Sequence, residues 1–80
     1  MNGEVKLRLL SRPNCGLCEE VAQQLNRRRL PFTEVNIEGD ESLERRYGHS
    51  IPVLFAGDDE IARAPITESS LEDALRRFRA

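Results

Sequence analysis

The feature that most constrains the fold of this chain is a pair of cysteines, Cys15 and Cys18, at the point where a strand pattern gives way to a helical one. Over residues 4–10, apolar residues alternate with charged ones, a pattern typical of a strand with one well-buried face. Residues 11–14 interrupt this pattern, and a helical pattern begins near Cys15. The cysteines are therefore predicted to lie at a strand-to-helix junction.

The predicted first helix carries Leu17, Val21 and Leu25 four positions apart, which places them on one face. Arginines at 27–29 are expected in its last turn, where positive charge complements the helix dipole. We expect Pro31 to end the helix, because proline lacks a backbone donor and restricts the residue before it. The helix thus has an apolar face for packing and a defined end.

The middle of the chain predicts a strand and a short helix. Strand-forming residues over 32–37 indicate the second strand, and a turn follows it. Asp40 can cap a helix over 41–47, and Gly48 is expected in the left-handed conformation after its last turn. The alternation of strands and helices in this half favours parallel pairing through right-handed crossovers.

The last part of the chain predicts a hairpin followed by a helix. Residues 51–55 are apolar and rich in strand formers, residues 57–59 form the turn, and residues 60–64 return as an antiparallel edge strand. A capping box over 69–72 opens the final helix. Its apolar residues share one face: Leu71, Ala74, Leu75 and Phe78.

These elements follow the order β-α-β-α-β-β-α, and we expect an α/β fold with a four-stranded mixed sheet flanked by helices. The 80 residues fit one domain over 1–80 and leave no room for a second core. Their hydrophobic fraction of 39% is enough for a compact unit without a disulfide or a metal.

The charges are spread along the chain and leave a net charge of −2, so no basic stripe is available for phosphate backbones. Nucleic acid is therefore not an expected partner. No segment approaches the ~20 apolar residues that cross a bilayer, and the first residues lack the pattern of a secretory signal. We expect no membrane partner and a cytoplasmic protein.

Two cysteines three positions apart point to redox or metal chemistry rather than to a framework of structural disulfides. At the start of a helix, the sulfur of Cys15 faces unpaired backbone N–H groups, which stabilise a thiolate and make this residue the expected nucleophile. Cys18, one turn further on, can attack a mixed disulfide on Cys15 and release the product. Arg12 is an expected auxiliary residue, because its charge adds a positive field near the thiolate.

Two other interpretations of the pair stay open. The cysteines can be ordinary half-buried thiols, although a pair at this spacing after a strand favours redox chemistry. A structural zinc site needs four ligands, and beyond the cysteines the chain offers His49 and no second C-x-x-C. We therefore expect no metal site within one chain, and we assign no role to His49, which lies in a predicted loop.

Two segments carry a resemblance to a known family: residues 13–18, PNCGLC, and residues 45–54, RRYGHSIPVL. Over nearly its full length, the chain resembles the glutaredoxin branch of the thioredoxin superfamily, and in particular the small bacterial glutaredoxin-like proteins. The resemblance implies the thioredoxin fold and a thiol-disulfide oxidoreductase that uses the dithiol. It also implies a cis peptide bond before Pro52, with the backbone of Ile51 presented to an extended substrate.

Two departures from the family pattern bear on the reductant. The motif C-G-L-C lacks the aromatic residue of C-P-Y-C, and residues 60–67 lack the G-G-x-D segment that holds glutathione in glutaredoxins. The resemblance therefore implies electrons from glutathione or from a thioredoxin-reductase-type flavoprotein, without a choice between them. We expect no organic cofactor, a disulfide-containing protein or small molecule as substrate, and a monomer.

Two alternative functions are compatible with the same fold. A non-catalytic module can dock a protein on the strand edge beside Pro52, with its thiols incidental. A metal or iron-sulfur carrier is the other, because Gly16 matches the C-G-F-S motif of cluster-binding relatives, although Cys18 replaces its serine. The thiol-disulfide reaction is the function that the residues favour.

Overall fold

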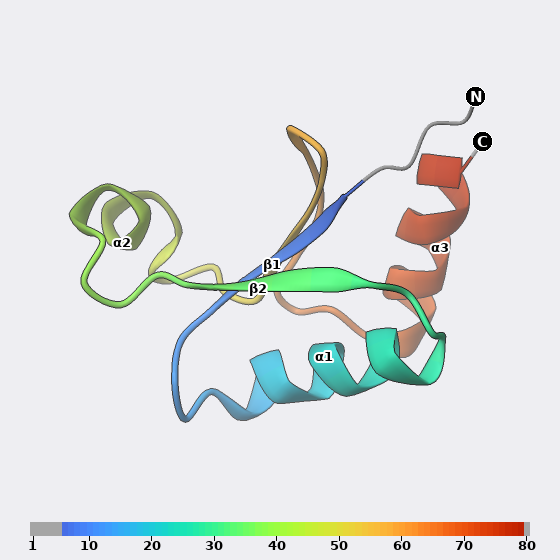
Figure 1. Ribbon diagram of the computed structural model, residues 1–80, viewed down its shortest axis with the longest axis horizontal. Coiled ribbons are helices and arrows are strands. Elements are labelled where there is room, and N and C mark those ends of the chain that lie inside the picture. Colours follow the sequence, from blue (N-terminus) through green and yellow to red (C-terminus); the bar gives the residue numbers. More distant parts are fainter. Residues whose placement is uncertain (1–5, 80) are drawn as a thin grey trace.

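A computed structural model describes residues 6–79 of the chain (Figure 1). These residues form four strands and three helices in the predicted order β-α-β-α-β-β-α. Residues 4 and 5 of the predicted first strand lie outside the described residues. The elements are β1 (Leu7–Ser11), α1 (Gly16–Arg27), β2 (Phe32–Asn36), α2 (Glu41–Tyr47), β3 (Val53–Ala56), β4 (Asp59–Arg63) and α3 (Glu68–Arg79).

The four strands form one mixed sheet in the order β2-β1-β3-β4. β1 pairs in parallel with β2, from Leu7 opposite Phe32 to Ser11 opposite Asn36. β3 runs antiparallel to both β1 and β4. The predicted mixed sheet is confirmed, as is the hairpin whose second strand lies at the edge. That strand begins at Asp59, one residue before its predicted start.

Helices cover both faces of the sheet, and residues 6–79 form two apolar clusters. The larger cluster joins the sheet to α1 and α3 and holds eight buried residues: Leu7, Leu9, Val21, Leu25, Leu54, Ala56, Leu71 and Leu75. The smaller cluster contains Leu10, Ile37 and Val53, and residues of α2 pack against it. Figure 1 shows α1 and α3 close together and α2 apart from them. The predicted buried face of β1 is confirmed, because Leu7 and Leu9 are buried while Arg8 on the other face is exposed. On that other face, Leu10 is only 4% exposed because it belongs to the smaller cluster.

Helix α1 ends at Arg27, before the predicted stop at Pro31. Arg29 adopts the left-handed conformation with φ 58°, and the N–H of Leu30 donates to the carbonyl of Leu25 at 3.0 Å. This is the pattern of a Schellman motif, in which bonds back to the last turn satisfy its carbonyls. The prediction of three arginines in the last turn is therefore wrong, because of the three only Arg27 lies in it.

Helix α2 matches its prediction at the start and differs from it at the end. The Asp40 carboxylate accepts from the N–H of Leu43 at 3.1 Å, which confirms Asp40 as the N-cap. Gly48 has φ −55°, so the predicted left-handed conformation is wrong. A side chain at this position would collide with the carbonyl oxygen of Glu44 and stand beside the guanidinium of Arg12. Close contact, rather than the backbone angle, explains the glycine.

The capping box of α3 lies two residues before its predicted position. The Thr67 hydroxyl accepts from the N–H of Ser70 at 3.0 Å, and the Ser70 hydroxyl accepts from the N–H of Thr67 at 2.9 Å. The helix therefore begins at Glu68, and the predicted box over 69–72 is wrong. The apolar face is confirmed, and its buried members are Leu71, Ala74 and Leu75.

Candidate active site

The loop between β1 and α1 sets the position of Cys15. β1 ends at Ser11, and Asn14 takes the left-handed conformation with φ 62°, which asparagine tolerates better than most residues. Cys15 follows in extended conformation as the N-cap of α1, and the helix begins at Gly16. The predicted strand-to-helix junction is confirmed, with the first cysteine at the cap itself.

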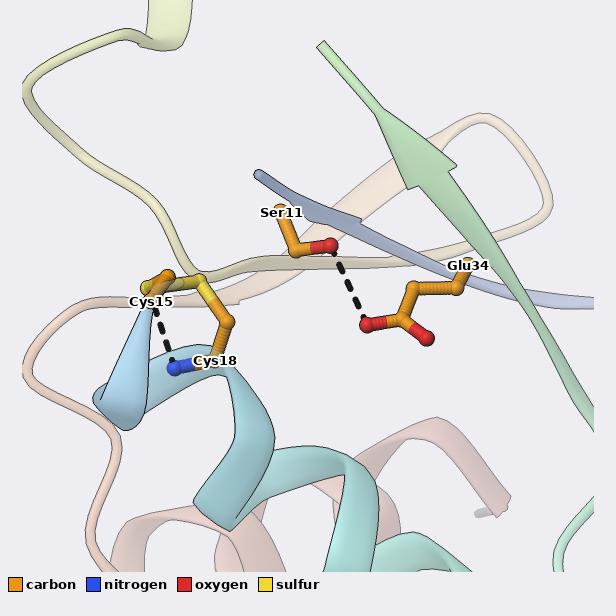
Figure 2. The surroundings of a disulfide bond; sticks show 4 residues. All are labelled: Ser11, Cys15, Cys18 and Glu34. Atoms are coloured by element: carbon orange, nitrogen blue, oxygen red, sulfur yellow. Dashed lines mark hydrogen bonds between the residues drawn. A yellow bond between two sulfur atoms is a disulfide. The ribbon is translucent and has the colours of Figure 1, made fainter. Parts of the chain in front are cut away.

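Cys15 and Cys18 are joined by a disulfide, with their Cα atoms 5.2 Å apart (Figure 2). The backbone N–H of Cys18 donates to the Sγ atom of Cys15 at 3.2 Å, which is the helix-start contact that the sequence predicts. Cys15 is half-buried, whereas Cys18 is only 1% exposed. Of the two cysteines, Cys15 is therefore the more accessible residue.

Leu17, between the two cysteines, differs from its prediction. It is 60% exposed, whereas the buried face of α1 consists of Cys18, Val21 and Leu25. Those residues follow a spacing of three and four, and Leu17 precedes the stripe by one residue, about 100° around the helix. Within residues 6–79, Leu17 is the one large apolar side chain that is exposed.

The segment before β3 passes the end of β1. Leu10 lies opposite Val53 in the sheet, so the next step of the register places Pro52 opposite Ser11. The peptide bond between Ile51 and Pro52 is cis, as the resemblance implies. Pro52 is fully buried. The cis-proline segment therefore lies at the strand end from which the chain leads to the cysteines.

Hydrogen bonds hold the backbone on both sides of Pro52. The carbonyls of Ser50 and Pro52 accept from the N–H of Ala64 at 3.3 and 2.9 Å. The N–H of Ile51 donates to the carbonyl of Tyr47 at 3.2 Å, while within residues 6–79 the carbonyl of Ile51 accepts no hydrogen bond. The resemblance implies that the backbone of Ile51 is presented to the substrate. Of its N–H and its carbonyl, the carbonyl is the group without a hydrogen-bond partner in residues 6–79.

Arg12 pairs with α2. Its Nη2 atom lies 3.1 Å from Oε1 of Glu44, and the other carboxylate oxygen of Glu44 accepts from the N–H of Gly39 at 3.3 Å. The charge of Arg12 is therefore balanced within the chain, and its auxiliary role toward Cys15 stays a prediction. His49, to which we assign no role, is exposed in the turn after α2.

A polar cluster beside the cis-proline segment has no counterpart in the sequence analysis. Arg63 on β4 donates to both carboxylate oxygens of Glu60, at 2.6 and 2.8 Å, and to the hydroxyl of Ser50 at 3.3 Å. The hydrogen bond from Arg63 lowers the pKa of Glu60. Residues three apart in a regular strand face opposite sides, but the register of β4 gains one residue at Ile61 and turns Glu60 and Arg63 to the same side. No local sequence signal marks this bulge.

A second unpredicted pair lies near the disulfide. Ser11 is only 4% exposed, and its hydroxyl donates to Oε2 of Glu34 on β2 at 3.1 Å (Figure 2). Because Leu9 lies opposite Glu34 in the parallel pair, both polar side chains share the face of the sheet that α1 covers. A serine at the end of a strand gives no sign of this partner, since the pairing depends on strand register.

Among residues 6–79, no group of three or more histidine, cysteine, aspartate and glutamate side chains is placed to hold a metal ion. No helix in this part of the chain is long and apolar enough to cross a membrane.

The four-stranded sheet, the cysteine pair at the start of α1 and the cis-proline segment define a class: an α/β protein with the thioredoxin fold and a neighbouring cysteine pair. A family model described as a glutaredoxin-like domain (DUF836) matches residues 6–76. The chain belongs to this glutaredoxin-like family of the thioredoxin superfamily, which confirms the resemblance in its sequence. The fold and the cysteine pair support a thiol-redox role at the level of the family.

Solved structures agree with this assignment. The X-ray structure of target protein XcR50 from X. campestris is 32% identical to the chain, with a TM-score of 0.78 over 89% of this chain and 96% of that one. The solution NMR structure of protein Ne2328 from Nitrosomonas europaea is 30% identical, with a TM-score of 0.73 over 91% and 96%. Glutaredoxin grx-1 from Archaeoglobus fulgidus, at 21% identity and a TM-score of 0.69 over 92% and 89%, shares the fold. No curated protein sequence matches the chain.

Proposed function

We propose that this protein is a thiol-disulfide oxidoreductase with Cys15 as its nucleophile and Cys18 as its resolving thiol. The contrast between the two cysteines carries the proposal, because Cys15 is half-buried at the helix start while Cys18 is 1% exposed. The N–H of Cys18 lies 3.2 Å from the sulfur of Cys15, where it stabilises negative charge. The contact that caps the helix thus supports a thiolate at Cys15.

In the proposed cycle, the Cys15 thiolate attacks a substrate disulfide, forms a mixed disulfide and releases the first substrate thiol. Cys18 then gives up its proton and attacks the sulfur of Cys15, which expels the second substrate thiol. The substrate gains two electrons and the two protons of the protein thiols, by way of solvent. The protein is left with the disulfide drawn in Figure 2, and a reductant restores its two thiols.

The segment with Ile51 and Pro52 is the proposed docking edge for substrate. Because Pro52 is buried, the substrate is expected to contact the backbone beside it. There, the carbonyl of Ile51 accepts no hydrogen bond within residues 6–79. An extended peptide can pair with such a group as an added strand does. Arg12 is proposed as an auxiliary residue that holds the cysteine loop in place through Glu44.

The proposed reaction requires no organic cofactor. Its substrates are disulfides of proteins or small molecules, and its electrons come from glutathione or a thioredoxin-reductase-type flavoprotein. We place the reaction in the cytoplasm, where reducing systems return such disulfides to thiols, and we propose that the protein acts as a monomer.

Reduction of hydroxyethyl disulfide and of insulin tests the proposal. We expect turnover by the wild type, none by Cys15→Ser, and an accumulating mixed disulfide on Cys15 in Cys18→Ser, which mass spectrometry detects. His49→Ala, at an exposed position without a role, is the control and should keep the wild-type rate. Absence of turnover in the wild type would favour the protein-binding module, and iron or zinc in the freshly purified protein would favour the carrier.

A further inference from the structure

We infer that Leu17 selects the substrate and favours polypeptide disulfides that carry an apolar side chain next to the cysteine under attack. This assignment rests on the proposed thiol-disulfide reaction and adds a substrate class to it. Leu17 lies between the two cysteines, in the first turn of α1, and its side chain is 60% exposed. An apolar side chain at this position can contact a substrate polypeptide whose disulfide approaches Cys15.

The surroundings of Leu17 are open to a partner. Within residues 6–79 it is the one large apolar side chain that is exposed. A Cβ placed on the adjacent Gly16 would meet nothing within 4 Å beyond its neighbours in the chain and its own helix backbone, so this side of the first turn is uncovered. In Figure 1, α3 lies toward the other end of α1. A substrate side chain can therefore contact Leu17 while its sulfur reacts with Cys15.

The arginines near the site argue against a small acidic disulfide such as glutathione disulfide. Arg12, in the loop before the first cysteine, is bound to Glu44 at 3.1 Å. Arg63, beside the cis-proline segment, is bound to Glu60 at 2.6 Å. A substrate carboxylate would have to displace a carboxylate of the chain at either arginine. The site therefore suits a substrate that is recognised without its carboxylates. An internal segment of a polypeptide is such a substrate.

The size of the contact suits a transient encounter. A stable protein-protein interface buries about 800 Å² on each partner, far more than one leucine side chain provides. A lasting complex, or a dimer of this chain held by Leu17, is therefore not expected. A contact of this kind instead discriminates between substrates, by about 10-fold for one apolar side chain.

The test uses two synthetic peptides, each with a single disulfide. The peptides differ only at the residue before the cysteine under attack, which is leucine in one peptide and serine in the other. The protein is first reduced with dithiothreitol and freed of it, and the second-order rate constant of each single turnover is measured by stopped flow. We expect the ratio of the two constants to be about 10 for the wild type and about 1 for Leu17→Ser. Leu17→Met, which keeps an apolar side chain, should retain the wild-type ratio. Gln23→Ser, at an exposed position further along α1, is the matched control and should also retain it.

A wild-type ratio near 1, or a ratio near 10 that persists in Leu17→Ser, would overturn the assignment of Leu17 and leave the redox reaction in place. Glutathione disulfide, run as a third substrate, is expected to react more slowly than the leucine peptide, and a faster reaction would overturn the polypeptide class. If the reduced wild type reacts with none of these and not with hydroxyethyl disulfide, the proposed function fails, and the assignment of Leu17 fails with it.

Discussion

The two faces of the sheet hold the two parts of the candidate site in different ways. The face covered by α1 and α3 has an apolar cluster of eight buried residues, and α1 buries Cys18 along with its apolar stripe. The other face has a cluster of three buried residues, and no residue of α2 is fully buried. Ile51, in the proposed docking segment, packs against this smaller cluster.

The comparison distinguishes a side fixed by a large apolar cluster from a side fixed by a smaller cluster together with polar contacts. Cys18, the proposed resolving cysteine, lies on a helix held by buried leucines. The docking segment holds the buried Pro52 and packs against the smaller cluster, and surface polar contacts add to this packing: the hydrogen bond from Arg63 to Ser50 and the ion pair of Arg63 with Glu60. Exposed ion pairs stabilise far less than buried leucines do. We therefore expect the docking side to open locally at a lower free energy than the cysteine side.

The largest effect is expected from Leu25→Ala, which opens a cavity in the larger cluster. Leu25 is fully buried, and it belongs to the cluster that joins α1 to the sheet and α3. The free energy of unfolding should fall by about 3 kcal/mol, because the removed atoms lose their burial and the cavity closes only in part. Urea denaturation measures the change. A loss below about 1 kcal/mol would show that this face is not the one fixed by packing.

Leu43→Ala is the counterpart on the smaller cluster. Leu43 is half-buried on α2, so less apolar surface is lost and solvent fills part of the space. We expect the free energy of unfolding to fall by about 1.5 kcal/mol. Measured under the same conditions, a loss equal to that of Leu25→Ala would remove the contrast between the two faces.

Asp40→Ala removes the N-cap of α2 and tests whether this helix opens independently of α1. The lost hydrogen bond to the N–H of Leu43 should lower stability by about 1 kcal/mol. Hydrogen exchange should become faster at the amides of α2 and stay unchanged in α1. Asp58→Ala, in the exposed hairpin turn, is the control. Equal acceleration in both helices would mean that α2 does not open on its own.

The smallest effect is expected from Glu60→Gln, and it should depend on pH. Because the hydrogen bond from Arg63 lowers the pKa of Glu60 in the folded protein, its charged form stabilises the fold above the ordinary pKa. This contribution is lost as pH falls through the lowered value. The wild type should therefore be slightly more stable than the variant at pH 7, and the difference should vanish in acid. A difference that grows in acid would contradict the assigned pairing.

Signals local to the chain predict most of the fold. The alternation in β1, the stripe on α3 and the Asp40 cap each depend on residues a few positions apart. The structure confirms them, apart from the burial of Leu10 on the other face of β1 and shifted element ends. The end of α1 differs because Arg29 takes a left-handed conformation, which its residue type does not predict. The start of α3 differs because Thr67 and Ser70 form a capping box two residues before the one expected.

The candidate site is predicted less completely, because part of it depends on contacts between distant elements. The cysteine pair follows from its spacing and its position after a strand. The exposure of Leu17 does not, since helical periodicity alone cannot show which of two adjacent stripes faces the sheet. The partners of Arg12 and Ser11 lie 32 and 23 positions away, and only the register of the strands and the placement of α2 bring them together.

The redox midpoint of the Cys15–Cys18 pair tests the central claim most directly. The protein is equilibrated in glutathione or dithiothreitol buffers of graded potential, and its free thiols are counted. We predict a reversible two-electron transition between about −120 and −270 mV, the span of known dithiol oxidoreductases. Failure to form a disulfide within the chain at any potential would contradict the proposed dithiol mechanism.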